Sequence, residues 1–334
     1  MAVSDQPVLV TGASGFVGSA VARALLAEGR KVRVLLRPSS DRGNIKGLDV
    51  DLVLGGLDDP QALKQAASGC GALYHVAADY RLWVRDPAPM YAANVEGTRL
   101  VMEAALAAGV ACVVYTSSVA TLGWNTDGEP ADENTPSEAS DMIGHYKRTK
   151  FMAEEVVRKL VRERNLPAVI VNPSTPVGPR DIKPTPTGRI IVEAASGRMP
   201  AYVDTGLNLV HVDDVASGHL LAEKRGRVGE RYILGGDDLM LAEILRIITE
   251  IAGRRPPKVQ IPIAVLGPVA FLAEGWANLT GSEPFLTRDG LRMARHRMFF
   301  SSAKAARELG YRPRPAAQGL ADAISWFRQA GMCP

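Results

Sequence analysis

Short apolar runs alternate with amphipathic stretches through the first half of the chain. The apolar runs predict strands at Val8–Val10, Val32–Leu36, Asp51–Leu54, Ala72–Val76, Cys112–Thr116 and Ala168–Val171. Stretches with a helical period lie between them, at Phe16–Glu28, Gln61–Ala67, Tyr91–Ala108 and Tyr146–Arg164. Because repeated strand–helix units form a parallel sheet with helices on both faces, we expect a doubly wound α/β domain over residues 1–173.

The pattern becomes irregular after residue 173. Five prolines lie within residues 173–187, which is typical of a loop. Helical periods return at Met240–Ala252, Ala303–Leu309 and Gly319–Ala330, and residues 208–215 are strand-like. We expect residues 174–334 to form a smaller C-terminal substrate lobe, from which residues 208–220 or so return to the main domain.

One apolar stretch in the C-terminal part, Ile261–Ala273, needs separate treatment. It has thirteen residues and is interrupted by Pro262, Gly267 and Pro268. A transmembrane helix needs about 20 residues, so we expect no membrane span here. One interpretation is a buried helix or a lid, and the other is an apolar wall for a lipid-like substrate or a shallow membrane-docking surface.

Charge and cysteine content narrow the class of protein. The chain has 39 basic and 36 acidic residues without a polybasic block, so we do not expect a nucleic-acid partner. Cys70, Cys112 and Cys333 are widely spaced and form no metal-binding or disulfide pattern, which is typical of a reducing compartment. Residues 1–5 show no signal segment. We expect a cytoplasmic protein without a bound metal.

A glycine-rich turn follows the first predicted strand. The sequence TGASGFVG over Thr11–Gly18 leads directly into the first predicted helix. Gly12 permits a tight turn, Gly15 lets backbone N–H groups approach a pyrophosphate, and Gly18 lets the helix pack closely on the strand. A strand, a glycine turn and a helix N-terminus in this order predict a Rossmann-type dinucleotide site.

The end of the second predicted strand indicates which dinucleotide is bound. An NAD site of this kind has a carboxylate there for the ribose 2′-hydroxyl, whereas this chain has Leu36 followed by Arg37. A guanidinium group binds a phosphate through paired hydrogen bonds, which favours NADP(H) and leaves NAD(H) as the alternative. Ser39 and Arg42 are further candidates for the same phosphate.

Tyr146 and Lys150 form a Tyr-x-x-x-Lys pattern on a predicted helix. Residues four apart share one helix face, so a phenol and an ammonium group can point into one cleft. A nearby cation lowers the pKa of a phenol, which makes the pair a candidate proton carrier beside a carbonyl or alcohol. An ordinary solvated helix face is the alternative.

Two polar positions follow predicted strands or open a helical stretch. Ser117 and Ser118 come directly after the strand Cys112–Thr116, where a hydroxyl can bind the oxygen of a reacting group or simply cap a helix. Asn94 is either a helix cap or an organiser of the active site.

Taken together, these motifs resemble the extended short-chain dehydrogenase/reductase superfamily. They occur in the expected order with His75-Val76-Ala77-Ala78, Asn172-Pro173-Ser174 and the segment Val210–Ala216. The resemblance implies that Tyr146 is the general acid/base, that Lys150 is its partner and a ribose ligand, and that Ser118 holds the substrate oxygen. In that family an acidic residue often precedes Leu57, where this chain has Gly56, and Asp58 is a candidate to compensate.

More closely, the segments HVAADYRLWVRDPAPMYAANVEGT and VVYTSSVATLG resemble the hopanoid-associated sugar epimerase group, which is similar to dihydroflavonol 4-reductases. This resemblance implies a small-molecule or lipid-linked polyol substrate. In the docking interpretation of Ile261–Ala273, the protein would contact the inner membrane face peripherally. The resemblance also implies a homodimer in which the helices at 95–108 and 146–164 pair as a four-helix bundle, and packing of these helices within one chain is the alternative.

The expected site has three parts. The catalytic residues are Ser118, Tyr146 and Lys150. The cofactor-binding residues are Gly12, Ser14, Gly15, Phe16, Val17, Gly18, Arg37, Leu57, Ala77, Ala78, Asn94, Tyr146, Lys150, Pro173, Thr175 and Val177. The substrate-binding residues are Tyr80, Trp83 and Ser118.

Three functions are compatible with these residues. An NADP(H)-dependent reductase would reduce an aldehyde or ketone, with Tyr146 as proton donor. An epimerase or dehydratase acting on a sugar or nucleotide sugar would remove a hydride and return it through a tightly bound NAD(P). A non-catalytic dinucleotide-binding scaffold or sensor is the third. Arg37 favours the reductase.

Overall fold

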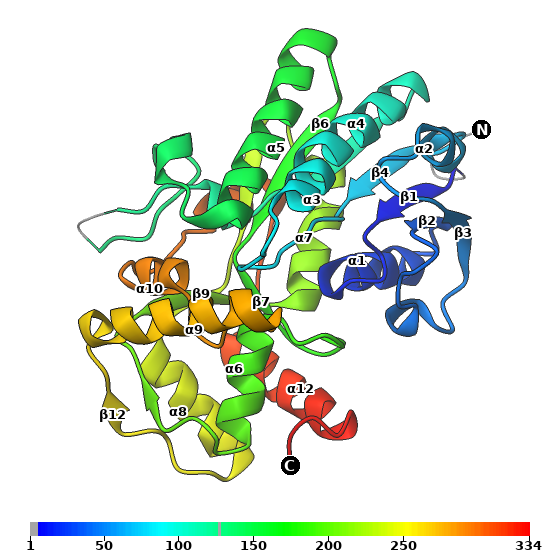
Figure 1. The fold of residues 1–334 in the computed structure, drawn as a ribbon. Helices are drawn as coiled ribbons and strands as arrows, with labels where there is room; N and C mark the ends of the chain where they lie inside the picture. The colour runs from blue at the N-terminus through cyan, green and yellow to red at the C-terminus, as the bar shows by residue number, and fades with distance from the viewer. Residues whose placement is uncertain (1–5, 126–127) are drawn as a thin grey trace.

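The computed structural model describes residues 6–125 and 128–334 and is built around one parallel sheet (Figure 1). Its strand order is β10-β6-β5-β4-β1-β2-β3, and every neighbouring pair is parallel. The strands are β1 (Val8–Thr11), β2 (Val32–Leu36), β3 (Val50–Leu54), β4 (Ala72–His75), β5 (Cys112–Thr116), β6 (Ala168–Pro173) and β10 (Arg231–Leu234). This arrangement confirms the expected doubly wound α/β fold.

Helices cover both faces of this sheet, and strand alternation divides the core between them. The helices are α1 (Phe16–Ala27) and α7 (Val212–Arg225) on one face, and α2 (Pro60–Ala67), α4 (Gly97–Ala107) and α5 (Gly144–Arg164) on the other. Val8 and Val10 lie in the core beneath α1 and α7, whereas Leu9 lies in the opposite core. Successive strand residues point to opposite faces, so one short strand supplies both cores.

The predicted helix at 91–108 is assembled from three pieces. A short helix, α3 (Ala88–Tyr91), leads through a π-helical turn at Ala92–Glu96 into α4. Isolated π turns of this kind often occur at functional sites because the extra residue displaces a side chain from the regular helical position. Asn94 lies in this turn and is therefore not a helix cap.

The strand-like prediction for residues 208–215 is wrong after residue 211. Strand β9 is Gly206–His211, and α7 begins at Val212. The imidazole Nδ1 of His211 accepts a hydrogen bond from the Asp213 N–H, and Asp213 and Asp214 lie in the first helical turn. Acidic residues there stabilise the positive end of a helix, and this capping outweighs the alternating apolar pattern.

Several segments that sequence patterns missed are strands. Within the proline-rich stretch, β7 (Thr175–Val177) pairs with β9, and β9 also pairs with β11 (Asp237–Met240) to form a second, three-stranded sheet. The four-residue strand β10 completes the main sheet, although it lies some sixty residues beyond Pro173. These strands are short and lack a long apolar run, so periodicity alone did not reveal them.

The remaining helices form the C-terminal part of the molecule. A third core joins α6 (Pro186–Ala195), α8 (Leu241–Ala252) and α12 (Ala316–Gln329). The other elements are α9 (Gly267–Thr280), α10 (Arg288–Ala294), α11 (Ala303–Leu309) and a short parallel pair, β8 (Ala201–Tyr202) and β12 (Val259–Gln260). Single 3-10 turns lie at Gly43–Ile45, Val119–Thr121, Ala139–Asp141 and Ile263–Leu266.

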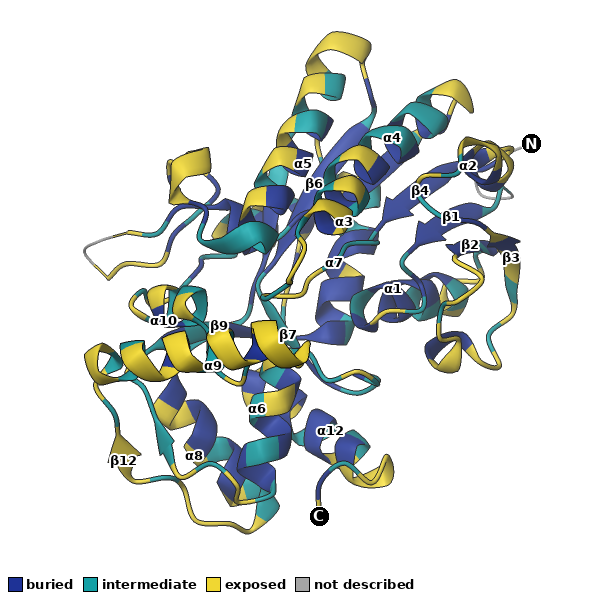
Figure 2. Cartoon of the chain, viewed as in Figure 1, coloured by how far each residue is buried: buried dark blue, intermediate teal, exposed yellow. Residues whose placement is uncertain are grey.

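The apolar stretch at 261–273 is not a buried helix, so that interpretation is wrong. It enters α9, and Figure 2 shows this helix mostly as exposed surface. The helical run Ile263–Thr280 is long and apolar enough to cross a membrane by length and composition, and only 11% of it is buried. The same test is passed by other kinds of helix, so it identifies an unusual exposed surface rather than a span.

Candidate functional site

The glycine turn between β1 and α1 brings three parts of the backbone into close contact. Gly12 has a φ of 73°, and a Cβ placed there would lie 2.6 Å from the Ala77 nitrogen. A Cβ at Gly18 would lie 2.1 Å from the Gly12 carbonyl oxygen. Side chains at these positions would push the turn away from both β4 and α1, so the backbone here has the close packing that a dinucleotide site needs.

The N-terminus of α1 is open to an anionic ligand. Its N-cap, Gly15, has extended backbone and provides no side-chain hydrogen bond, and no acidic residue lies in the first turn. The N–H groups of a first helical turn, together with the helix dipole, bind phosphate. The glycine turn and the uncapped helix therefore fit a pyrophosphate.

A buried asparagine outside the predicted set supports this turn. Asn44 is 3% exposed, and its side-chain amide donates to the carbonyl oxygens of Ser14 at 3.2 Å and Arg180 at 3.1 Å. Asn44 thus joins the phosphate turn to the loop after β7. Sequence reasoning missed it because it lies in a loop far from any motif.

The end of β2 carries a positive charge and no carboxylate. Leu36 is buried in the core, and the next residue, Arg37, is exposed together with Ser39 and Arg42. Although burial raises the pKa of Asp79, the hydrogen bonds and charge of Arg81, aided by the charge of Arg37, hold it below its usual range. Arg37 therefore lies close to the loop after β4, on the side of the glycine turn.

The acidic residue near the expected adenine position is Asp58. A Cβ at Gly56 would lie 2.1 Å from Asp58 Oδ1, so this carboxylate folds back over the glycine. Leu57 packs against Gly97, where a Cβ would lie 2.9 Å from the Leu57 Cβ. The departure from the family pattern at Gly56 thus leaves a carboxylate in the same neighbourhood.

The three predicted catalytic residues come together at the carboxyl end of β5. Ser118 follows this strand, and its side chain hydrogen-bonds the phenol of Tyr146, which lies in the first turn of α5. Ser118 also caps the 3-10 turn, because its Oγ accepts the Ala120 N–H at 3.1 Å. The two interpretations of this serine are therefore compatible in the structure.

The proton affinity of Tyr146 differs from the sequence-based expectation. Burial raises the pKa of the phenol, and the hydrogen bond to Ser118 lowers it only in part. We expected a neighbouring cation to lower the pKa of Tyr146. Loss of contact with water has the larger effect on this pKa, and the group that opposes it, Ser118, is a neutral hydroxyl. Tyr146 is consequently protonated at neutral pH.

Lys150 lies four residues after Tyr146 on α5, is buried, and is held by β5. Its Nζ donates to the Thr116 carbonyl at 2.7 Å and to Tyr115 Oη at 3.4 Å. Burial lowers the pKa of Lys150 to about 8, although the charge of Glu154 opposes this shift. Lys150 is therefore a cation whose charge depends on pH in the neutral to mildly alkaline range.

Glu154 lies one helical turn after Lys150 and was not among the predicted residues. Its Oε2 accepts hydrogen bonds from Ser117 at 2.5 Å, Thr121 at 2.9 Å and Asn172 at 3.1 Å. Its Oε1 lies 3.3 Å from Arg231 on β10. The sequence does show a carboxylate four residues after Lys150. Charged residues on a helix are usually solvated, however, so this spacing alone is a weak signal.

Asn94 connects the loop after β4 to α5. Its Oδ1 accepts from the Asp79 N–H at 2.7 Å, and its Nδ2 donates to the Asp79 carbonyl at 2.8 Å and to Thr149 Oγ1 at 2.9 Å. Because these bonds use both ends of its amide group, Asn94 holds the loop after β4 against α5 beside the site. Of its two sequence interpretations, the structure supports the organiser.

The other predicted cofactor residues line the same edge of the sheet in different ways. The Ala77 N–H donates to Thr11 Oγ1 at 3.3 Å, and Ala78 follows it in the loop after β4. Phe16 and Val177 have side chains in hydrophobic cores, so only their backbone can face a ligand. The remaining positions, Val17, Pro173 and Thr175, lie at the start of α1, the end of β6 and the start of β7.

A polar cavity of about 320 Å³ lies beside the start of α5. It is lined by Leu82, Trp83, Val84, His145, Glu274, Asn278, Arg288, Asp289 and Arg292. Trp83 thus lies where a substrate residue was expected, whereas Tyr80 is outside this lining and is exposed. His145, next to Tyr146, and five polar residues of α9 and α10 were missed, because only tertiary folding brings these helices to the cavity.

Comparison with known proteins agrees with this geometry. The sequence model of the NAD dependent epimerase/dehydratase family matches residues 8–235, from β1 through β10. The chain belongs to this family. It is therefore an NAD(P)-dependent enzyme of the extended short-chain dehydrogenase/reductase superfamily rather than a non-catalytic scaffold.

Relatives of this epimerase/dehydratase family member include both reductases and epimerases. A protein of Synechocystis, provisionally named a dihydroflavonol 4-reductase, is 44% identical and covers 96% of this chain and 94% of its own length. Sterol demethylase protein B of Methylococcus capsulatus is 36% identical, with 97% and 99% covered. The crystal structure of a nucleoside-diphosphate-sugar epimerase of Pseudomonas aeruginosa is 28% identical and has a TM-score of 0.82, with 98% and 99% covered.

Proposed function

We propose that this enzyme reduces a carbonyl group to an alcohol with NADPH, on a sugar-derived or hopanoid side-chain substrate. The observation that carries the proposal is the pairing of Ser118 with Tyr146 at the carboxyl end of β5, with the buried Lys150 one turn further along the same helix. These groups lie at the carboxyl edge of the sheet, where ligands of doubly wound proteins bind. The glycine turn and the open N-terminus of α1 support cofactor binding at the same edge.

The proton step follows from the state of Tyr146. A half-buried, protonated phenol can donate its proton to a carbonyl oxygen that Ser118 also binds, and this pairing suits reduction. A reduced nicotinamide bound at this edge would supply the hydride for the carbonyl carbon. Lys150, on the same helix face as Tyr146, stabilises the phenolate that remains until a proton from solvent restores it.

Arg37 supports the choice of NADPH. It follows β2 at the position where an NAD site has a carboxylate, and its charge acts on Asp79 in the loop after β4. A guanidinium group there attracts a 2′-phosphate and gives a 2′-hydroxyl no acceptor. The names of the Synechocystis relative, a reductase, and of the Methylococcus capsulatus relative, a sterol demethylase protein, support a substrate with an apolar ring system or side chain.

A second candidate function is epimerisation of a sugar or nucleotide sugar. The likeness to the Pseudomonas aeruginosa epimerase favours it, since the same Tyr, Lys and Ser serve hydride removal and return. Lys147 and His296 beside Trp124 also provide polar groups near the site. In this function the pocket would hold the oxidised intermediate until the hydride returns to its other face.

The deciding experiment measures cofactor balance. The purified enzyme is mixed with NADPH and a panel of aldehydes and ketones, and absorbance of the reduced nicotinamide is followed. Net loss of NADPH with formation of an equal amount of alcohol is expected. Isomerisation of a sugar without net NADPH consumption would instead establish the epimerase, and tight NADPH binding without either reaction would reject both.

We also propose that the enzyme is cytoplasmic and forms a homodimer. All three cysteines are free thiols, which fits a reducing cytoplasm. The exposed parts of α4 and α5 supply the surface for the expected homodimer. Size-exclusion chromatography with light scattering tests the dimer, and cell fractionation tests the compartment.

A further inference from the structure

An exposed apolar surface runs along α9 and the loop that follows it. We call it the α9 patch and define it by Val265, Phe271, Leu272, Trp276, Leu279 and Phe285. Five of these are more than 60% exposed: Phe271 at 62%, Leu272 at 70%, Trp276 at 67%, Leu279 at 84% and Phe285 at 83%. Half-exposed single residues are ordinary, but six large apolar side chains on one helix and its loop indicate a binding surface.

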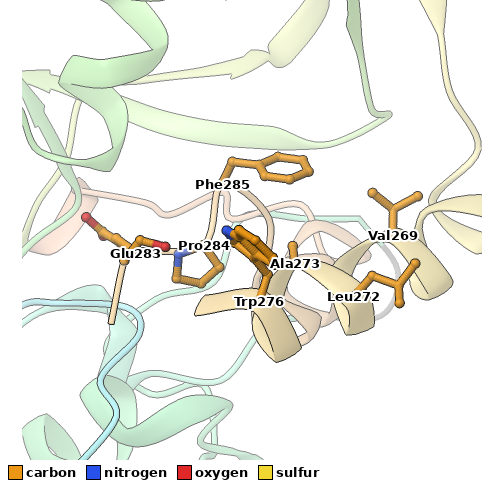
Figure 3. Close-up of a pocket in the computed structure, with 8 residues that line it drawn as sticks. Val269, Leu272, Ala273, Trp276, Glu283, Pro284 and Phe285 are labelled. Atoms are coloured by element: carbon orange, nitrogen blue, oxygen red, sulfur yellow. The ribbon is translucent and has the colours of Figure 1, made fainter. Parts of the chain in front are cut away.

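The patch is hollowed rather than flat. A cavity of about 380 Å³ lies between α9 and the loop at 282–285, and Trp276 and Phe285 stand on either side of it (Figure 3). Val269, Leu272, Ala273 and Pro284 make the rest of the wall apolar, and Ser282 and Glu283 are the two polar residues of the lining. Such a hollow accepts a hydrocarbon chain.

The inner side of α9 is fixed to the protein, which determines how the patch can be used. Ala270 and Ala277 are fully buried, and Glu274 pairs with Arg288 at 2.6 Å and also accepts the Arg288 N–H at 2.7 Å. Insertion across a bilayer would break this pairing and leave Glu274 in hydrocarbon. The helix is therefore suited to lie along an interface with its outer side in lipid.

Positive charge gathers around the patch. Residues 253–297 contain seven Lys and Arg against three Asp and Glu, whereas the rest of the chain contains 32 against 33. Arg254, Arg255 and Lys258 are exposed in the loop that leads to α9. The segment that carries the α9 patch thus has a net charge of +4 (7 − 3), whereas the rest of the chain has −1 (32 − 33), and a basic, apolar segment is the combination that anionic lipid attracts.

We propose that the α9 patch docks on the surface of an anionic phospholipid bilayer. Trp276, Phe271 and Phe285 enter the boundary between headgroups and acyl chains, where aromatic side chains are favoured. Arg254, Arg255 and Lys258 contact the headgroups. A second copy of the chain would offer the same apolar patch, but it would also bring an equally basic segment to the contact, and like charges repel.

Docking has a consequence for the substrate, and this step rests on the proposed reductase function. Glu274 and Asn278 lie on the other side of α9 and line the polar cavity with His145 and Trp83. A docked enzyme would hold this cavity next to the membrane. An amphiphile could then present its polar, carbonyl-bearing end to Tyr146 while its apolar part stays with the patch.

Vesicle flotation tests docking without any turnover. The purified protein is mixed with vesicles of phosphatidylcholine alone or with about one third phosphatidylglycerol, at low and high salt. We expect binding to the anionic vesicles, weakened by salt. The double variant Leu272→Ser/Trp276→Ser should lose at least about tenfold in binding, since two large side chains no longer enter the lipid.

Matched controls separate docking from damage. Leu54→Ser/Val228→Ser changes two exposed apolar residues outside the patch and should bind like the wild type. Arg254→Glu/Arg255→Glu should lose binding only to anionic vesicles. Thermal unfolding checks that each variant is folded.

Three results would overturn the proposal. One is no binding of the wild type to either vesicle. Another is equal loss in the patch variant and in the Leu54/Val228 control. The third is a patch variant that changes a dimer to a monomer while the wild type fails to float, which would identify a second copy as the occupant. Failure of the reductase assay would leave the flotation result unaffected.

Discussion

The hydroxyl of Ser117 donates a 2.5 Å hydrogen bond to the buried carboxylate of Glu154. The next residue, Ser118, turns to the opposite side and hydrogen-bonds the phenol of Tyr146. Two adjacent serines thus have separate tasks at the end of β5, one in the protein interior and one at the proposed reaction centre.

This divergence predicts different effects for the two alanine variants. Ser118→Ala should lower kcat by about 10²-fold with little change in unfolding temperature, because it removes a donor to the developing oxyanion. Ser117→Ala should instead cost about 1–3 kcal/mol in the free energy of unfolding, since Glu154 loses a buried donor. Steady-state kinetics and denaturant unfolding of both variants measure this, and equal effects of the two on kcat would contradict the assignment.

Tyr146→Phe tests the proton donor. The variant should lose at least about 10²-fold in kcat, because the ring remains but the hydroxyl that donates the proton is gone. NADPH affinity, measured by fluorescence titration, should stay within a factor of a few. Tyr91→Phe, which changes a phenol that contacts only His145 at 3.4 Å, is the control and should keep its turnover. Retained activity in Tyr146→Phe would assign proton transfer to another group.

The pH dependence of reduction should report the charge of Lys150. Burial lowers its pKa to about 8, so the ammonium is present below this pH and is lost as pH rises through it. Because the ammonium stabilises the phenolate, kcat/KM for reduction should fall above about pH 8. Tyr146, with its raised pKa, stays protonated over this range.

Lys147 provides the control for this profile. Burial also lowers its pKa to about 8, but its Nζ lies over Trp124, at 5.4 Å from the ring centroid. Lys147→Met should keep the fall in kcat/KM, whereas Lys150→Met should have a low, flat profile. A fall that disappears with Lys147→Met would transfer the titration to that residue.

Arg37→Asp should exchange the cofactor preference. We expect NADPH to bind about tenfold or more weakly, through loss of the phosphate contact, and NADH to bind more tightly through the new carboxylate. Arg162→Asp, an exposed arginine on α5, is the matched charge change and should leave both affinities as they are. Unchanged NADPH affinity in Arg37→Asp would remove Arg37 from the site.

Gly12 and Gly29 allow the role of the glycine turn to be isolated. Their φ angles are 73° and 74°, but a Cβ at Gly29 would meet no atom within 4 Å, whereas one at Gly12 would lie 2.6 Å from the Ala77 nitrogen. Gly29→Ala should therefore cost only about 1 kcal/mol from backbone strain. Gly12→Ala should cost more and also lose cofactor binding, as calorimetry and NADPH titration would show.

Sequence patterns predicted the main sheet because their signal is local. Val8–Val10 and Cys112–Thr116 read as buried strands, and the family motifs identified Ser118, Tyr146 and Lys150, which the structure brings together. Ligand roles for these residues stay predictions until the experiments above are done. The same holds for the domain boundary at residue 173.

What the sequence did not reveal depends on contacts between distant segments. Glu154 is buried among partners that only the folded chain brings together, such as Asn172 on β6 and Arg231 on β10. Asn44 likewise reaches Ser14 only in the folded chain. The pKa of Tyr146 likewise depends on how completely the pocket is enclosed, which spacing on a helix cannot specify. The exposure of α9 was also open, since composition does not tell a buried apolar helix from an exposed one.

Strand β10 has a practical consequence for dissecting this enzyme. It forms the outer strand beside β6, with Tyr232, Ile233 and Leu234 fully buried, and α7 covers the neighbouring core. A fragment ending near residue 173 would leave β6 as a bare, apolar sheet edge prone to aggregation. A chimera that takes its substrate preference from a relative must therefore keep its own β10 and α7 with the main sheet. Only the C-terminal segments before and after β10 can be exchanged.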